Sequence, residues 1–187
     1  MPIINDGNEQ ETLGILQAAN LMIISARTAP KSGGIDDVLT AIVTGDEKET
    51  IAIEMEKLAI ERKIEKFKRD ALNVRHSEVI VLIGVRGTKK FGLDCGACGY
   101  ASCKSFEKAA KKLIGLDFEG PTCLLKALDL GIAIGSAVKM AGMLNVDNRI
   151  MYRVGTVAKR LNYMPEASVI MGIPLSASGK SIYFDRG

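Results

Sequence analysis

The chain has 187 residues, of which 47% are hydrophobic and 25% are charged. This length and balance are typical of one soluble globular domain and exclude a disordered chain. The net charge of +3 is too small to indicate bulk nucleic-acid binding, and an aromatic content of 5% without tryptophan argues against base-stacking surfaces. The single histidine, His76, excludes zinc sites that need two imidazoles. We therefore expect no nucleic-acid partner.

The sequence shows no feature of export or of a membrane span. Its first residues lack the basic region and the long apolar stretch of a signal peptide. The most apolar run, 124–144, is interrupted by Lys126, Asp129 and Lys139, whereas a spanning helix needs about 20 mostly apolar residues. We expect a cytoplasmic protein without a membrane partner, in which cysteines serve metal or redox roles rather than disulfides.

The first half of the chain begins with a helical pattern. Apolar residues recur at helical spacing over 9–26, and a proline- and glycine-containing break follows at 29–34. Residues 36–43 fit either a short helix or an extended segment. Asp46 and Glu49 resemble a capping box, which predicts one long helix reaching about residue 73. The apolar stripe of that helix would consist of Ile60, Ile64, Phe67 and Ala71.

The second half is predicted to contain two strands and three helices. The strand candidates are short, β-branched runs at 78–85 and 167–173. The helices are expected over 101–114, from about 121 to 144 and over 147–161. No repeat or linker divides the chain, so we predict a single α+β domain spanning 1–187. A glycine-rich, cysteine-bearing segment, 84–123, is embedded in it.

All four cysteines lie within 29 residues of sequence, in the pattern Cys95-x2-Cys98-x4-Cys103-x19-Cys123. Cys95 and Cys98 stand in a glycine-rich loop, which lets the backbone wrap closely around an inorganic cluster. Helical spacing places Cys103 on the apolar face of the following helix. Cys123 follows Gly120-Pro121 near a helix start, where the helix dipole stabilises a thiolate.

These four thiolates can converge on one centre. A four-iron–four-sulfur (4Fe–4S) cluster fits best, because such clusters commonly take three cysteines close in sequence and one remote. Structural zinc is the next alternative, although it prefers two paired cysteine units. Structural or disulfide-bonded cysteines are the third. The predicted metal ligands are therefore Cys95, Cys98, Cys103 and Cys123.

The cysteine segment resembles the iron–sulfur module of electron-transfer and corrinoid iron–sulfur proteins. In that module, C-G-x-C-G-x-x-x-C-x-x-F precedes a lone cysteine about twenty residues on. Here the match runs from Cys95 to Phe106 and ends with Cys123. The whole chain is similar to a family of ferredoxin-domain proteins of unknown function, whose outline resembles the flavin-dependent nitroreductases.

Three further segments carry the nitroreductase resemblance. Residues 26–32 (ARTAPKS) resemble that family's A-x-x-A-P-S segment, 125–142 resemble its central helix, and 161–174 resemble its final strand region. The resemblance implies nitroreductase-like helices around a small sheet, a homodimer and a possible FMN. The phosphate-binding arginines of that family are absent from residues 1–12. The remaining candidates for FMN contact are Lys31, Ser32 and Lys180.

These features predict an iron–sulfur redox protein, either transferring electrons or acting as a small flavin-linked oxidoreductase. The alternatives are a non-catalytic electron carrier or sensor and a zinc-stabilised structural domain. A redox partner protein is expected in the first two cases. No catalytic residue can be assigned from the sequence, since His76 follows a charged helix and no dinucleotide or P-loop fingerprint is present.

Overall fold

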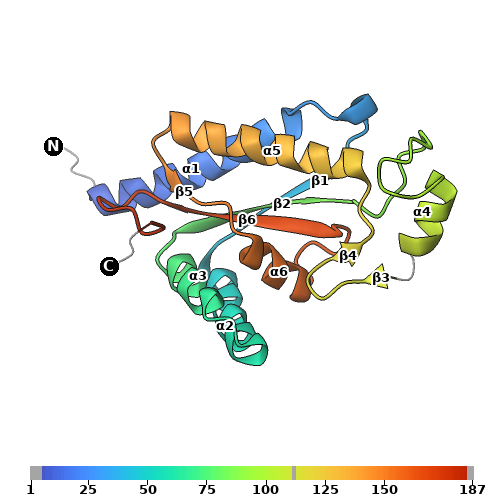
Figure 1. Cartoon of the computed structure of the whole chain (residues 1–187). Coiled ribbons are helices and arrows are strands. Elements are labelled where there is room, and N and C mark those ends of the chain that lie inside the picture. Colours follow the sequence, from blue (N-terminus) through green and yellow to red (C-terminus); the bar gives the residue numbers. More distant parts are fainter. Residues whose placement is uncertain (1–5, 111–112, 185–187) are drawn as a thin grey trace.

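The computed structural model describes residues 6–110 and 113–184. Its centre is a four-stranded antiparallel sheet in the order β1-β2-β6-β5 (Figure 1). The strands are β1 (Val38–Val43), β2 (Val79–Val85), β6 (Val169–Ser176) and β5 (Asp147–Asn148). The strand predicted at 78–85 is confirmed as β2, and all seven of its residues are buried. Segment 36–43, undecided from the sequence, contains β1.

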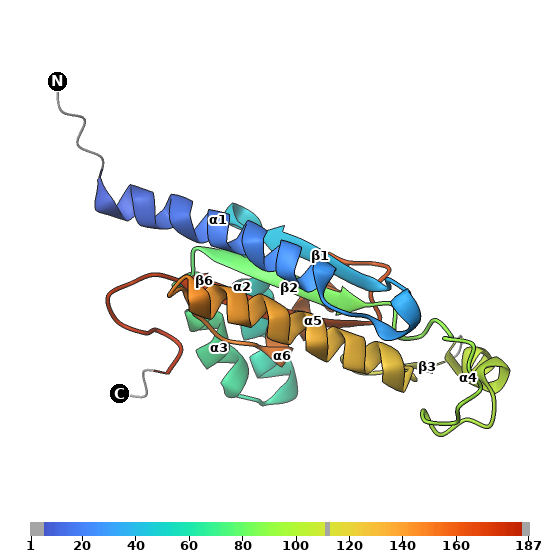
Figure 2. The ribbon, with the colours of Figure 1, turned by 90° about the horizontal axis from the view of Figure 1, so that it is seen from above.

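Helices cover both faces of this sheet. On one face, α1 (Gly7–Thr28) and α5 (Leu124–Met143) lie side by side (Figure 2). The opposite face carries three shorter helices (Figure 1), which are α2 (Gly45–Arg62), α3 (Lys66–Arg75) and α6 (Tyr152–Arg160). This arrangement confirms the predicted α+β class.

The central strand β2 separates two hydrophobic cores. Successive side chains of a strand point to opposite faces, so Ile80 and Leu82 pack with α2, α3 and α6. Val81 and Ile83 pack with α1 and α5. Because both faces are covered, β2 reads as a continuous apolar run rather than an alternating one.

The cysteine-bearing segment lies beyond one end of the sheet in both views (Figures 1 and 2). It contains α4 (Cys103–Ala110) and a two-stranded pair, β3 (Leu113–Ile114) with β4 (Glu119–Gly120). Within the described residues, the helix predicted over 101–114 covers 103–110, and residues 111–112 lie outside the described part. The chain returns from β4 to the sheet through α5.

The prediction of a single helix from about residue 46 to residue 73 is wrong. The chain leaves the helical path at Lys63, whose φ is 56°, and α3 then folds back against α2. The left-handed residue is a lysine, so no glycine or proline marks the break in the sequence. Ile60 consequently stays 72% exposed, whereas Phe67 is buried.

Other boundaries also shift for tertiary reasons. The proposed capping box is not formed: the N-cap of α2 is Thr44, and Glu49 instead accepts a 2.8 Å bond from the Arg75 guanidinium. The helix predicted from 147 begins at Tyr152, because Asp147 and Asn148 pair with β6. No helix within the described residues is long and apolar enough to cross a bilayer.

Candidate functional site

The four cysteines line one small, largely apolar pocket beside α4. All four carry free thiols: Cys123 is buried, Cys98 and Cys103 are half-buried, and Cys95 is exposed. The non-cysteine walls include Phe91, Phe106, Leu124 and Leu125. The structure thus brings the predicted ligand residues into one place, with one edge of the pocket open to solvent.

The loop that carries Cys95 and Cys98 depends on left-handed backbone positions. Gly96 and Gly99 have φ values of 69° and 84°, and the Gly99 N–H donates to the Gly96 carbonyl at 2.9 Å. This turn folds the loop around its two thiols. The loop closes on α4 through Asp94, whose carboxylate accepts from the Cys103 N–H and whose own N–H donates to the Cys103 sulfur at 3.4 Å.

Helix α4 presents Cys103 and Phe106 to the same pocket, as its helical spacing predicts. Phe106 is 1% exposed and is the one buried residue described on this helix. Its ring meets Tyr100 edge-to-face, with ring centroids 5.8 Å apart. This aromatic pair packs α4 against the cysteine loop.

The remote cysteine reaches the pocket through a contact with the end of β2. Cys123 is the N-cap of α5, and its N–H donates to the Gly87 carbonyl at 2.9 Å. The Gly87 N–H in turn donates to the Ser168 hydroxyl at 2.8 Å. A Cβ on Gly87 would lie 2.6 Å from the Thr122 methyl, so only glycine fits this approach.

The donor set of this pocket fits an iron–sulfur cluster. It offers four free cysteines, apolar walls and a backbone N–H that donates to a ligand sulfur, which are the features that hold such clusters and tune them. Within 6–110 and 113–184, no group of three or more His, Cys, Asp or Glu residues is arranged to hold a single metal ion.

A buried ion pair lies close to this pocket and was not predicted from the sequence. Lys126 of α5, 1% exposed, contacts the carboxylate of Asp37, 3% exposed, and Lys89 donates to the same carboxylate at 2.8 Å. Burial raises the pKa of Asp37, but the bonds from Lys126 and Lys89 outweigh it and lower the pKa overall. The hint in the sequence was that Lys126 is one of three charged residues that interrupt the most apolar run of the chain.

Two of the three residues predicted to contact FMN, Lys31 and Ser32, make hydrogen bonds within the chain. The Lys31 ammonium, 8% exposed, donates to the carbonyls of Arg27 and Ala29 at the end of α1. The N–H and hydroxyl of Ser32 both donate to one oxygen of Asp129, at 2.9 and 2.8 Å. Lys180 belongs to the tail after β6, and this tail lies at the end of the molecule opposite α4 in both views (Figures 1 and 2).

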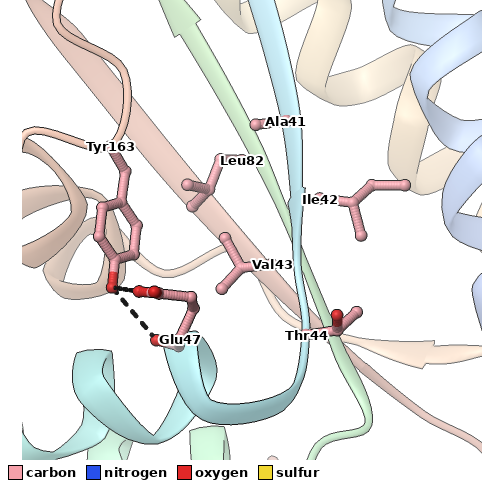
Figure 3. Close-up of a pocket in the computed structure, with 7 residues that line it drawn as sticks. All are labelled: Ala41, Ile42, Val43, Thr44, Glu47, Leu82 and Tyr163. Carbon is pink, nitrogen blue, oxygen red and sulfur yellow. Dashed lines mark hydrogen bonds between the residues drawn. The ribbon is translucent and has the colours of Figure 1, made fainter.

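A larger groove of about 380 Å³ lies next to β1 (Figure 3). Its polar feature is the Tyr163 hydroxyl, which donates to the Glu47 carboxylate. Burial and this bond raise the pKa of Tyr163 to about 12. The remaining walls are mostly apolar and contain none of the four cysteines.

Solved structures of several flavoproteins share this fold. A BluB-like flavoprotein from Clostridium difficile is 14% identical, with a TM-score of 0.53 over 96% of this chain and 87% of its own. A Desulfovibrio desulfuricans protein described as a nitroreductase, in complex with FMN, is 11% identical, with a TM-score of 0.55 over 95% and 90%. Nitroreductase A from Vibrio parahaemolyticus is 11% identical, with a TM-score of 0.54 over 88% of this chain, which spans 59% of its length. The fold is therefore nitroreductase-like.

The sequence comparisons define the family. Residues 119–186 match the family described as "Uncharacterized protein containing a ferredoxin domain (DUF2148)", a region that includes Cys123 but not the other three cysteines. A protein from Archaeoglobus fulgidus is 52% identical over 173 residues, which cover 92% of both chains. The chain therefore belongs to one family with this Archaeoglobus fulgidus protein, its residues 119–186 match the ferredoxin-domain family, and its fold is nitroreductase-like.

Proposed function

We propose that the protein is an iron–sulfur redox protein in which Cys95, Cys98, Cys103 and Cys123 hold a 4Fe–4S cluster. When bound, this group accepts and releases one electron at a time. The observation that carries the proposal is the placement of four free thiols on one apolar pocket. The ferredoxin-domain description of the family supports it.

The surroundings of the thiols suit such a role. The apolar walls limit water, and the N–H of Asp94 directed at the Cys103 sulfur stabilises negative charge on that sulfur. The exposed Cys95 leaves one edge of the site accessible to a redox partner protein. A small edge of this kind is suited to the brief docking of an electron carrier.

The first experiment is purification without oxygen, followed by assays of iron, sulfide, zinc and released flavin on one sample. We expect a brown protein with about four irons and four sulfides per chain. A colourless protein with one zinc would instead support a zinc-stabilised structural domain. A colourless protein without metal would contradict both readings.

Two variants test the ligand assignment. Cys98→Ser should lose the cluster, because a hydroxyl is a poor ligand for iron. Ala97→Ser is the matched control, since it adds a hydroxyl to the same pocket wall without removing a thiol. Undiminished iron in Cys98→Ser would contradict the assignment, whereas Ala97→Ser should keep its iron.

A flavin-linked oxidoreductase is the second candidate function. It is favoured by the fold, which is shared with a protein solved in complex with FMN. Lys31 and Ser32 give it no direct support, because both already donate hydrogen bonds within the chain. Stoichiometric flavin in the anaerobic sample would favour the oxidoreductase, and its absence would favour a carrier.

We also propose that the protein is a homodimer that uses the outer surface of α1 and α5. Apolar residues on that surface remain exposed in the single chain; they include Leu13, Leu16 and Ile24 on α1 and Leu124, Leu128 and Ile132 on α5. An extended apolar surface on two adjacent helices is a common dimer contact.

A further inference from the structure

The Asp37–Lys126 ion pair is the most deeply buried charge pair near the cysteines. Lys126 is 1% exposed and Asp37 is 3% exposed, and their side chains are in direct contact. Lys89 adds a second cation at 2.8 Å from the same carboxylate, and Arg86 adds a third at 4.0 Å. The four residues come from the segment before β1, the loop after β2, and α5.

The side chain of Phe91 links this pair to the cysteine pocket. Lys126 follows the ligand candidate Cys123 by three residues, so the two lie on adjacent turns of the same side of α5. The Lys126 ammonium lies 5.8 Å from the centroid of the Phe91 ring. Phe91 itself lines the pocket with the four cysteines. Phe91 is therefore close to the ammonium and also forms part of the cysteine pocket.

We propose that the charges of Lys126 and Asp37 set the reduction potential of a cluster held by the four cysteines, Cys95, Cys98, Cys103 and Cys123. The inference rests on the proposed function. Uptake of one electron from a partner adds negative charge at the pocket. The Lys126 ammonium stabilises that charge and raises the potential, while the Asp37 carboxylate opposes it and limits the rise.

The environment makes this effect larger than that of a surface lysine. Charges that are shielded from water interact through a lower effective dielectric and are screened weakly by salt. A buried ion pair contributes little to stability compared with an apolar pair of similar size. Its place beside the redox pocket therefore points to an electrostatic role in addition to a structural one.

The test measures the reduction potentials of Lys126→Met and Asp37→Asn and compares each with that of the wild-type protein. All samples are purified without oxygen, and the iron content per chain of each is determined. Lys126→Met should lower the potential, and Asp37→Asn should raise it. At a separation on the order of 10 Å and an effective dielectric of about 20, each change corresponds to about a tenfold shift in the ratio of reduced to oxidised protein. For a one-electron couple, a tenfold shift is about 59 mV.

Two controls separate charge from structure. Lys126→Arg keeps the charge and should keep the potential. Lys104→Met removes an exposed lysine next to Cys103, and its effect should be smaller and should vanish in high salt. Opposite shifts of the two buried variants, unaffected by salt, would support the proposal.

The remaining outcomes overturn it. Unchanged potentials, or shifts of the same sign in both variants, would show that the pair does not tune the site. If Lys126→Met loses its iron, the potential of Asp37→Asn decides the question: a raised potential supports the proposal, and an unchanged or lowered potential overturns it. Loss of iron from Lys126→Arg and Asp37→Asn together would assign the pair to folding alone. Wild-type protein without iron and sulfide would refute the proposed function itself, before any variant is measured.

Discussion

The Asp94 carboxylate accepts a hydrogen bond from the Cys103 N–H, while the Asp94 N–H donates to the Cys103 sulfur across 3.4 Å. This reciprocal contact closes the cysteine loop onto the first residue of α4. Asp94 has a φ of 49°, a conformation that asparagine and aspartate tolerate better than other non-glycine residues. One residue therefore supplies an acceptor for the first N–H of α4 and the turn that precedes it.

Asp94→Ala should weaken retention of the proposed cluster. It removes an acceptor at the start of α4, a loss that costs about 1 kcal/mol in a typical helix cap, and places alanine in a strained conformation. The measurement is iron per chain after a timed challenge with a chelator. Asp94→Asn is the control, because it keeps an acceptor and tolerates the backbone. Equal iron loss in both variants, or in neither, would contradict this role.

Gly87→Ala should destabilise the protein by about 1–3 kcal/mol, as overpacking of a tight contact does. Its Cβ would lie 2.6 Å from the Thr122 methyl and 2.9 Å from the Ser168 hydroxyl, next to the bond that holds Cys123. Denaturant unfolding monitored by circular dichroism provides the measurement.

Gly14→Ala is the comparison for that experiment. Gly14 lies inside α1 with open space around it, so alanine there should stabilise by about 0.5–1 kcal/mol through helix propensity. A neutral Gly87→Ala would show that the end of β2 and the start of α5 can separate without cost.

Ile132→Glu should convert the proposed dimer into a monomer. Ile132 is 45% exposed on α5, and a carboxylate there would be buried without a partner in a helix-to-helix contact. Light scattering should show a fall from twice the chain mass to the mass of one chain. Ile60→Glu, a change on the opposite layer at a residue that is 72% exposed, should leave the mass unaltered. A monomeric wild-type protein would refute the dimer.

The Tyr163–Glu47 contact predicts an alkaline limit to stability. The pKa of Tyr163 is raised to about 12 by burial and by its bond to Glu47, against a usual value of 10. Because the folded state holds this proton more tightly than the unfolded state, the contribution is complete below pH 10 and is lost between pH 10 and 12.

Unfolding free energies measured across that pH range provide the test. Tyr163→Phe should reduce the loss of stability between pH 10 and 12, since the late-titrating phenol is gone. Absorbance at the phenolate band should show a smaller late phase in the same variant. An unchanged late phase would show that Tyr163 titrates normally.

Local sequence patterns predicted the helices and strands whose structure depends on residues close by in the sequence. The apolar, β-branched run of β2 and the helical periodicity of α1 appear where they were expected. The break at Lys63 was missed, because a left-handed lysine leaves no mark in a pattern of apolar residues. The exposure of Ile60 follows from that break rather than from its own surroundings in the sequence.

By itself, the sequence determined the α+β class, the central strand and the grouping of four cysteines, since these depend on spacing over a few residues to a few turns. The tertiary structure alone decided that Lys126 meets Asp37 and that Asp129 occupies both donors of Ser32. Those partners are 89 and 97 residues apart in the chain. Packing of α5 against the segment before β1 brings them together, and no local periodicity encodes a contact at that separation.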